Sequence, residues 1–187
     1  MDARGEVTRL LGELAGGDES AFDRLIPIVY QDLRRIAQRH MRHQDVAITV
    51  NATALVHEAY LRLVDQTQIH WKDCDHFLSV YSVVMRNLLV DMARRRRSIK
   101  HGGERTRVTL EPGTAAIDHQ VDHLLAVDEA MTRLAEIDAR LARVVECRFF
   151  AGFSEKETAS ALGVTERTVQ RDWVKARAIL SEWIDAN

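Results

Sequence analysis

Residues 151–177 have the sequence AGFSEKETASALGVTERTVQRDWVKAR, which predicts two helices joined by a tight turn. Ser154 and Glu157 match the S-x-x-E capping box, in which hydroxyl and carboxylate bond to each other's free backbone N–H groups, so a helix begins there. This helix ends near Gly163, and Thr165 is a suitable N-cap for the next helix. The pattern indicates a helix-turn-helix, whose second helix can enter the major groove of DNA.

The start of this second helix carries polar and basic side chains on its outward face. Glu166, Arg167, Gln170 and Arg171 lie where side chains contact base edges, and Lys175 lies farther along, where contact with phosphates is expected. The alternative is an ordinary helical hairpin whose charged face is merely solvated.

The rest of the chain also predicts helices, because apolar residues recur at steps of three and four. These stretches cover residues 22–37, 55–63 and 77–92 in the N-terminal half, and 124–134 and 141–149 in the C-terminal half. In the third stretch, the expected inward residues are Phe77, Val80, Tyr81, Val84, Leu88 and Met92. No segment shows the sustained alternation of a strand. We therefore expect an all-α protein with a three-helix N-terminal bundle.

Glycine and proline divide the chain into two parts. Gly102, Gly103, Pro112 and Gly113 fall within a dozen residues, after a long stretch without glycine. Such a cluster is typical of a linker. We expect two small helical domains, residues 1–99 and 122–187, joined by a flexible linker over residues 100–121.

Composition limits the ways in which the chain could bind nucleic acid. The 187-residue chain is 46% hydrophobic and has a formal net charge of -2, so it can bury a core but cannot coat nucleic acid by bulk electrostatics. Any DNA contact must be local, as at the run Arg94 to Arg97, which suits either the negative end of a helix dipole or a DNA backbone.

Cysteine usage and the N-terminal sequence predict a cytoplasmic protein. Cys74 and Cys147 are isolated, which fits a reducing compartment and argues against a disulfide framework or a zinc module. The first residues lack the hydrophobic run of a signal peptide or membrane span, so we expect no membrane insertion.

Neither an enzyme nor a metalloprotein is indicated. The chain has no phosphate-binding glycine loop, no HExxH and no serine nucleophile motif, so we expect no catalytic residues and no cofactor. His119 and His123, and the group His70, Cys74 and His76, do not form complete tetrahedral ligand sets, so we expect no metal.

Three segments resemble, in their order and spacing, the extracytoplasmic-function (ECF) class of the bacterial sigma-70 family. Residues 54–63, ALVHEAYLRL, resemble the helix of region 2.2, and Phe77, residues 85–88 (MRNL), Asp91 and residues 94–97 resemble the promoter −10 helix. Residues 151–177 resemble region 4.2. The resemblance covers nearly the whole chain.

The resemblance implies a sigma factor that directs RNA polymerase core to specific promoters, with region 2 recognising and melting the −10 element and region 4 recognising the −35 element. The residues implied for −35 recognition are Thr165, Glu166, Arg167, Thr168, Gln170, Arg171 and Lys175. Those implied for the −10 region are Trp71, Arg86, Asn87, Arg94, Arg95, Arg96 and Arg97. Those implied for core binding are His57, Glu58, Leu61, Arg62 and Asp65.

The implied partners are promoter DNA and the polymerase core, through its largest-subunit coiled coil and its flap, with an anti-sigma factor as a further candidate. Region 2 would capture a flipped base in the loop over residues 65–75. Trp71 is the candidate for stacking on that base, and the alternative is a ring that plugs the end of the bundle. The sequence departs from the family at Asn51, Thr53 and Ala54, where acids are usual, and at Glu166 and Trp173.

The other function left open is a dimeric helix-turn-helix repressor or activator that acts without replacing the sigma subunit. The affinity of the free chain for duplex DNA separates the two functions. The near-neutral charge predicts that this binding is weak, whereas tight and sequence-specific binding would favour the repressor or activator. A sigma factor would gain its affinity from polymerase, which holds both domains at high effective concentration.

Overall fold

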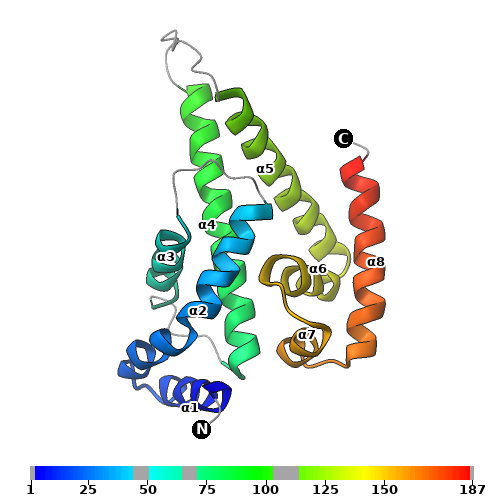
Figure 1. Cartoon of the computed structure of the whole chain (residues 1–187). Coiled ribbons are helices and arrows are strands. Elements are labelled where there is room, and N and C mark those ends of the chain that lie inside the picture. The colour runs from blue at the N-terminus through cyan, green and yellow to red at the C-terminus, as the bar shows by residue number, and fades with distance from the viewer. Residues whose placement is uncertain (1–2, 44–50, 65–70, 103–113, 186–187) are drawn as a thin grey trace.

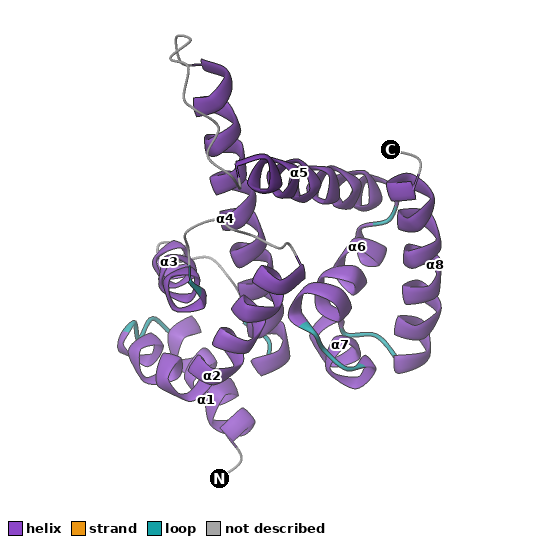
Figure 2. Ribbon diagram, turned by 45° about the horizontal axis from the view of Figure 1, so that its top comes forward, coloured by secondary structure: helices purple, strands orange, loops and turns teal. Residues whose placement is uncertain are grey.

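The computed structural model describes residues 3–43, 51–64, 71–102 and 114–185, and within these ranges all regular structure is helical (Figures 1 and 2). The elements are α1 (Ala3–Ala15), α2 (Ser20–His43), α3 (Ala52–Val64), α4 (Cys74–Gly102), α5 (Thr114–Ile137), α6 (Ala139–Val145), the π-helix η1 (Glu146–Ala151), α7 (Glu155–Leu162) and α8 (Glu166–Asp185). The expected all-α fold is confirmed.

The N-terminal half contains one helix more than the sequence analysis expected. Helix α1 buries Val7, Leu10 and Leu11 and packs against α2. These residues and Leu14 follow the i, i+3, i+4, i+7 spacing of an amphipathic helix. The amphipathic spacing is present in the sequence, but charged residues separate its short apolar pairs, so α1 was not among the expected helices.

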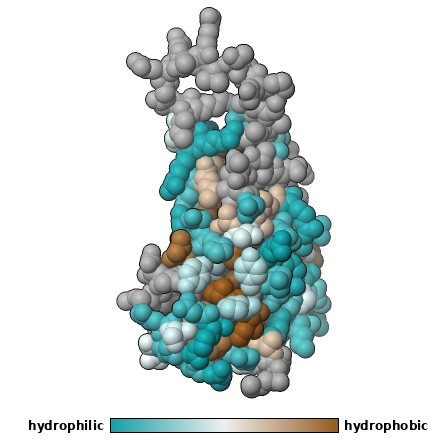
Figure 3. Space-filling model, turned by 60° about the vertical axis from the view of Figure 1, so that its left-hand side comes forward, coloured by the Kyte–Doolittle hydropathy of each residue, from teal (hydrophilic) through white to brown (hydrophobic). Residues whose placement is uncertain are grey.

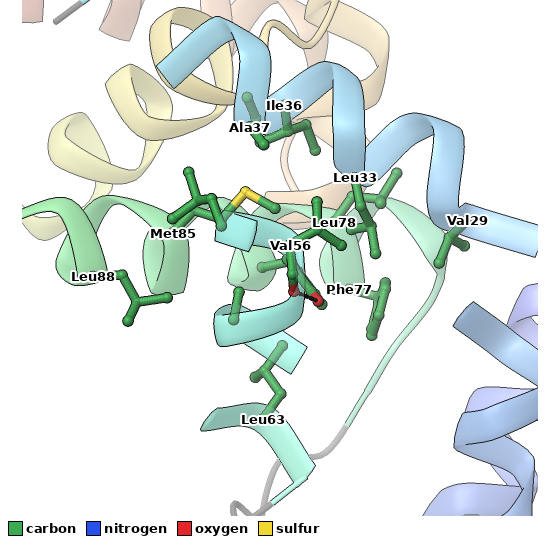
Figure 4. Close-up of a cluster of buried hydrophobic side chains, with 14 of the residues drawn as sticks. Val29, Leu33, Ile36, Ala37, Val56, Leu63, Phe77, Leu78, Met85 and Leu88 are labelled. Carbon is green, nitrogen blue, oxygen red and sulfur yellow. Dashed lines mark hydrogen bonds between the residues drawn. The ribbon is translucent and has the colours of Figure 1, made fainter. Parts of the chain in front are cut away.

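Helices α2, α3 and α4 share the largest part of the core (Figure 4). Val29, Leu33 and Ile36 of α2 lie over Phe77 and Met85 of α4, and α3 closes the cluster with Val56 and Leu63. Burying each large apolar side chain contributes about 1.5–3 kcal/mol to folding. This core fixes the direction of α4, the long helix on which the other elements are arranged.

The inward face of α4 is wider than expected. Phe77, Tyr81 and Leu88 are buried as predicted, but Val80, Val84 and Met92 are only half-buried. Met85, Leu89 and Ala93 are buried instead. The reason is that α4 contacts α2 and α3 on one side and α5, α7 and η1 on another, so no single stripe describes its packing.

The C-terminal half has its own small core. Its buried members are Met131, Leu134, Leu141, Ala142, Val145, Phe150 and Ala176. Phe149, expected to face inward, is 37% exposed, whereas Phe150 is buried. The widened turn of η1 explains the difference, because a π-helix shifts the register of an α-helical face by one residue.

The two halves pack against each other along α4 (Figure 1). Helix α4 contacts α5, α7 and η1, and α2 contacts η1. One continuous apolar cluster includes Leu89 of α4 together with Leu124, Cys147 and Ala161 from the C-terminal half. Helix α4 extends to Gly102 and α5 begins at Thr114, while residues 103–113 of the expected linker lie outside the described residues. The domain boundaries at 99 and 122 stay a prediction.

Candidate nucleic-acid interface

Helices α7 and α8 form the helix-turn-helix that the sequence predicted. The amide of Ser154 donates to Glu157 Oε2 over 2.8 Å, and the Glu157 amide donates to Ser154 Oγ over 3.2 Å, which completes the capping box. Gly163 ends α7 at φ 67°, a left-handed conformation that glycine adopts without strain. The Thr168 amide donates to Thr165 Oγ1 over 3.2 Å, so Thr165 caps α8 as expected.

The buried face of this motif holds α8 against α6. Val144, Ala159 and Val169 form a small cluster beneath the turn. Asp172 of α8 is only 2% exposed and accepts a hydrogen bond from Arg140 Nε over 2.6 Å. Burial raises the pKa of Asp172, but the hydrogen bonds and charges of Arg140 and Arg171 outweigh it and hold the pKa below its usual value. The α8 helix is thereby fixed by one buried carboxylate as well as by apolar contacts.

The opposite face of α8 is open to solvent. Most of the side chains implied for −35 recognition are exposed, and only Thr168 among them is half-buried. The exposed ones are the cap Thr165 and, on α8 itself, Glu166, Arg167, Gln170, Arg171 and Lys175. The Arg171 side chain is 70% exposed, and its Nε atom donates to Asp172 Oδ1 over 3.2 Å. The first turns of α8 therefore present two arginines that a nucleic acid can reach.

The basic face of α4 is divided between solvent and protein. Asn87, Arg95 and Arg97 are exposed and Arg96 is half-buried. Arg94 is exposed but donates to Asp128 Oδ2 of α5 over 3.0 Å. Arg86 is largely covered, and it pairs with Asp128 of α5 and Glu146 of η1. The sequence places these cations on one helix, and the fold gives two of them acidic partners.

Trp71 packs on the N-terminal core. It is half-buried, and its ring lies 5.1 Å from that of Phe77 and 6.2 Å from that of His76. Both pairs meet edge to face, a favourable arrangement for aromatic rings. These contacts place the ring against the N-terminal core, and both roles that the sequence left open for Trp71, base stacking and closing the end of the bundle, stay predictions.

Helix α3 presents a mixed apolar and polar surface. His57 and Glu58 are exposed, and Leu61 is an exposed leucine, at 57%. Arg62 is half-buried and pairs with Asp91 of α4 over 2.9 Å, while Asp65 lies outside the described residues. Figure 3 shows the left-hand side of Figure 1, the side on which α3 lies. Patches of hydrophobic surface on this side of the molecule are surrounded by hydrophilic residues.

Two arginines that the sequence analysis did not single out connect the halves. Arg4 of α1 donates to Asp75 of α4 over 2.6 Å and to Glu157 of α7 over 2.7 Å. Arg39 of α2 donates from Nε to the carbonyl oxygen of Phe149 over 2.6 Å. Their partners are far away in the chain, so no local pattern could have identified them.

The residues that the structure describes form no metal site. His70, which the sequence analysis considered together with Cys74 and His76, lies outside the described residues. Both cysteines are buried, and burial raises the pKa of Cys74 to about 11 and that of Cys147 to about 12. They are therefore thiols at neutral pH and act as small apolar side chains. Within the described ranges, no helix has the length and apolar character needed to cross a membrane.

The family model described as ECF sigma factor matches residues 4–185, which is almost the whole chain and includes both halves of the structure. No match was found among curated proteins.

Proposed function

Because the chain belongs to the ECF sigma factor family, we propose that it directs RNA polymerase core to specific promoters through separate surfaces on its two halves. The family consists of transcription initiation factors rather than enzymes, with polymerase core and promoter DNA as partners. The finer assignment gives −35 recognition to α8, −10 recognition and melting to α4, and core binding to α3. It places the protein in the cytoplasm with the polymerase.

The exposed N-terminal face of α8 is the observation that carries the proposal. Arg167 and Arg171 are both exposed and stand one turn apart, while the opposite side of the helix is anchored by Val169 and Asp172. A helix held in this way can lie in the major groove, where an arginine can form two hydrogen bonds with guanine. Lys175, one turn farther along, is placed for a phosphate contact.

The −10 assignment is supported by the exposed part of α4. Asn87 has an exposed polar side chain for a base edge, and Arg95 and Arg97 extend the cationic surface toward the helix end. The packing of Trp71 on Phe77 favours a structural role for that ring. We therefore assign duplex opening to the α4 surface and the loop before it, with Trp71 as a support for α4.

Core binding is assigned to the outer face of α3. An exposed leucine flanked by exposed polar residues suits a helical partner, because the leucine can be buried on binding while the polar residues form the rim. Leu61, His57 and Glu58 meet this description. We propose that this face binds the largest-subunit coiled coil, that the C-terminal half binds the flap, and that an anti-sigma factor would compete for these same surfaces.

Reconstituted transcription tests the proposal. Purified chain is added to polymerase core with DNA fragments from the cognate genome, and the transcript starts are mapped. We expect initiation at a defined set of promoters that depends on the chain, and no initiation with core alone.

The same experiment separates the two classes of regulator. Failure of the chain to associate with core, combined with tight and specific binding of a palindromic duplex by the chain alone, would contradict the sigma assignment. It would instead support a dimeric helix-turn-helix repressor or activator.

A further inference from the structure

The Asp172 carboxylate lies between two arginines from different helices. Its Oδ2 atom accepts a hydrogen bond from Arg140 Nε of α6 over 2.6 Å, and its Oδ1 atom accepts one from Arg171 Nε of α8 over 3.2 Å. The Asp172 side chain is 3% exposed, whereas those of Arg140 and Arg171 are 47% and 70% exposed. One buried carboxylate therefore links a residue of α6 to a residue on the open face of α8.

Arg140 is itself held in place at the start of α6. Asp138 is the N-cap of this helix, and its Oδ1 atom accepts hydrogen bonds from the amides of Arg140 and Leu141 over 3.0 and 3.3 Å. Leu141 is fully buried in the C-terminal core, so the first turn of α6 is fixed both by its cap and by apolar packing. Because the backbone of Arg140 is fixed, its guanidinium group has a defined place from which to hold Asp172.

The two arginines also keep the Asp172 carboxylate ionised. Burial acts to raise the pKa of Asp172, but the hydrogen bonds and charges of Arg140 and Arg171 hold it below its usual value. An unbalanced negative charge at this place would repel the phosphates of a nucleic acid. Arg140 balances the carboxylate from the protein side, which leaves the charge of Arg171 for a ligand.

The contact with Asp172 uses one donor of the Arg171 guanidinium group. A guanidinium carries five N–H donors, one on Nε and two each on Nη1 and Nη2. With Nε bonded to Asp172, the donors on Nη1 and Nη2 remain for a ligand, and the side chain is exposed enough to reach one. Guanine presents two acceptors in the major groove, O6 and N7, which a pair of arginine donors matches.

A side chain that is held before binding discriminates better between base pairs. A free arginine has many rotamers, and the loss of this freedom on binding opposes association. Arg171, held at its Nε atom, has less freedom to lose and can reach acceptors at fewer places in the groove. Pre-organisation of this kind therefore favours one base pair over the others, more than it raises general affinity for DNA.

We infer that Asp172, anchored by Arg140, is a positioning residue that presents the Nη1 and Nη2 donors of Arg171 to one guanine of the −35 element. The preferred base pair at that position is thus determined in part by α6, and Arg140 acts through Asp172 rather than on the base. The inference deepens the proposed function and rests on it, because it takes a −35 base pair as the ligand of Arg171.

Nuclear magnetic resonance of the free full-length chain tests the positioning by itself. In a proton–nitrogen correlation spectrum, the Nε–H signal of Arg171 is assigned from its absence in Arg171→Lys. We expect Arg140→Met to shift or broaden this signal, because the Asp172 carboxylate is no longer anchored. Arg143→Met is the matched control and should leave the signal unchanged. It removes the same charge from an exposed residue of α6 that, among the described residues, makes no ion pair.

Reconstituted transcription tests the consequence for specificity. Promoters that differ in one −35 base pair are transcribed in pairs by the holoenzyme, and the ratio of the two products is measured. We expect Arg140→Met to reduce the preference for guanine at one position by about fivefold, a fraction of the roughly tenfold to hundredfold discrimination of a complete arginine–guanine contact. Arg143→Met should keep the wild-type preference. The ratio does not depend on the folded fraction, because both promoters compete for the same active holoenzyme.

A double variant shows whether Arg140 acts through Arg171. In Arg171→Ala the guanine preference is already lost, so the addition of Arg140→Met should change the ratio no further. A further change in this background would overturn the inference, because Arg140 would then act by another route. An equal loss on all promoters from Arg140→Met alone would also overturn it and make Arg140 a phosphate contact or a structural residue.

The two experiments separate this inference from the proposed function. An Arg171 signal that is the same in Arg140→Met and in the wild type would overturn the positioning, and it would leave promoter-dependent initiation by the wild type intact. Absence of that initiation would overturn the proposed function and, with it, the −35 guanine as the ligand. A shifted signal in Arg140→Met would still support the positioning of Arg171 by Asp172 and Arg140 in the free chain.

Discussion

Arg140 of α6 donates to Asp172 of α8 over 2.6 Å, and so ties the outward-facing helix of the helix-turn-helix to the helix behind it. The same carboxylate accepts a hydrogen bond from Arg171, whose side chain is otherwise largely exposed to solvent. A buried acid thus connects the position of α8 with the orientation of an arginine on its outer face.

Replacing Asp172 should lower stability in a pH-dependent way. We expect Asp172→Asn to reduce the free energy of unfolding by about 1–2 kcal/mol at pH 7, a modest value because Arg140 is half-exposed. The folded pKa of Asp172 lies below its unfolded value, so this stabilisation is present above about pH 4 and is lost as the pH falls through the folded pKa. Urea unfolding at pH 7 and pH 3 measures it. An equal difference between variant and wild type at both pH values would contradict the assignment.

Arg171→Ala should weaken discrimination between −35 sequences. If Arg171 contacts a base, the loss is about 1–3 kcal/mol for the preferred base pair and little for the others. Transcription by reconstituted holoenzyme from promoters that differ at single −35 positions measures this. Lys175→Ala is the control, because loss of a phosphate contact lowers activity equally on all of them. The same uniform loss from Arg171→Ala would make it a phosphate contact.

Alanine variants of two leucines in α3 should distinguish loss of stability from loss of core binding. Leu55 is fully buried and Leu61 is 57% exposed, so the same leucine-to-alanine change is made in two environments. Leu55→Ala should cost about 2–5 kcal/mol of stability, whereas Leu61→Ala should leave the melting temperature nearly unchanged. Leu61→Ala should weaken binding of polymerase core, measured by competition with a labelled wild-type chain. Unchanged core binding by a folded Leu61→Ala variant would remove α3 from the core interface.

Trp71 provides a test of the bundle-end role. Because its ring packs edge to face on Phe77, Trp71→Ala should lower the melting temperature and Trp71→Phe should largely restore it. Promoter opening, followed by permanganate reactivity of unpaired thymines, should decline only as far as the folded fraction does. A Trp71→Ala variant with wild-type stability but defective opening would instead identify a base-stacking residue.

Local patterns explain why much of the fold could be predicted. The capping box at Ser154, the helix end at Gly163 and the Thr165 cap could all be predicted, because each depends on residues within a few positions of one another. The predictions were wrong or incomplete where the regular spacing of apolar residues was disturbed. The π-helix moves Phe149 outward and Phe150 inward. Helix α1 is as long as α3, at 13 residues, but charged residues separate its apolar pairs, so it was not among the expected helices.

The sequence by itself determined the helical fold, the helix-turn-helix and the set of exposed cations on α8, because caps and apolar spacing act within single helices. Only the tertiary structure decided that Arg86 and Arg94 of α4 face Asp128 and Glu146, and that Arg39 reaches the Phe149 carbonyl. These partners lie 34 to 110 residues apart in the chain. Their pairing follows from the burial of one shared apolar core, a long-range effect that no local spacing encodes.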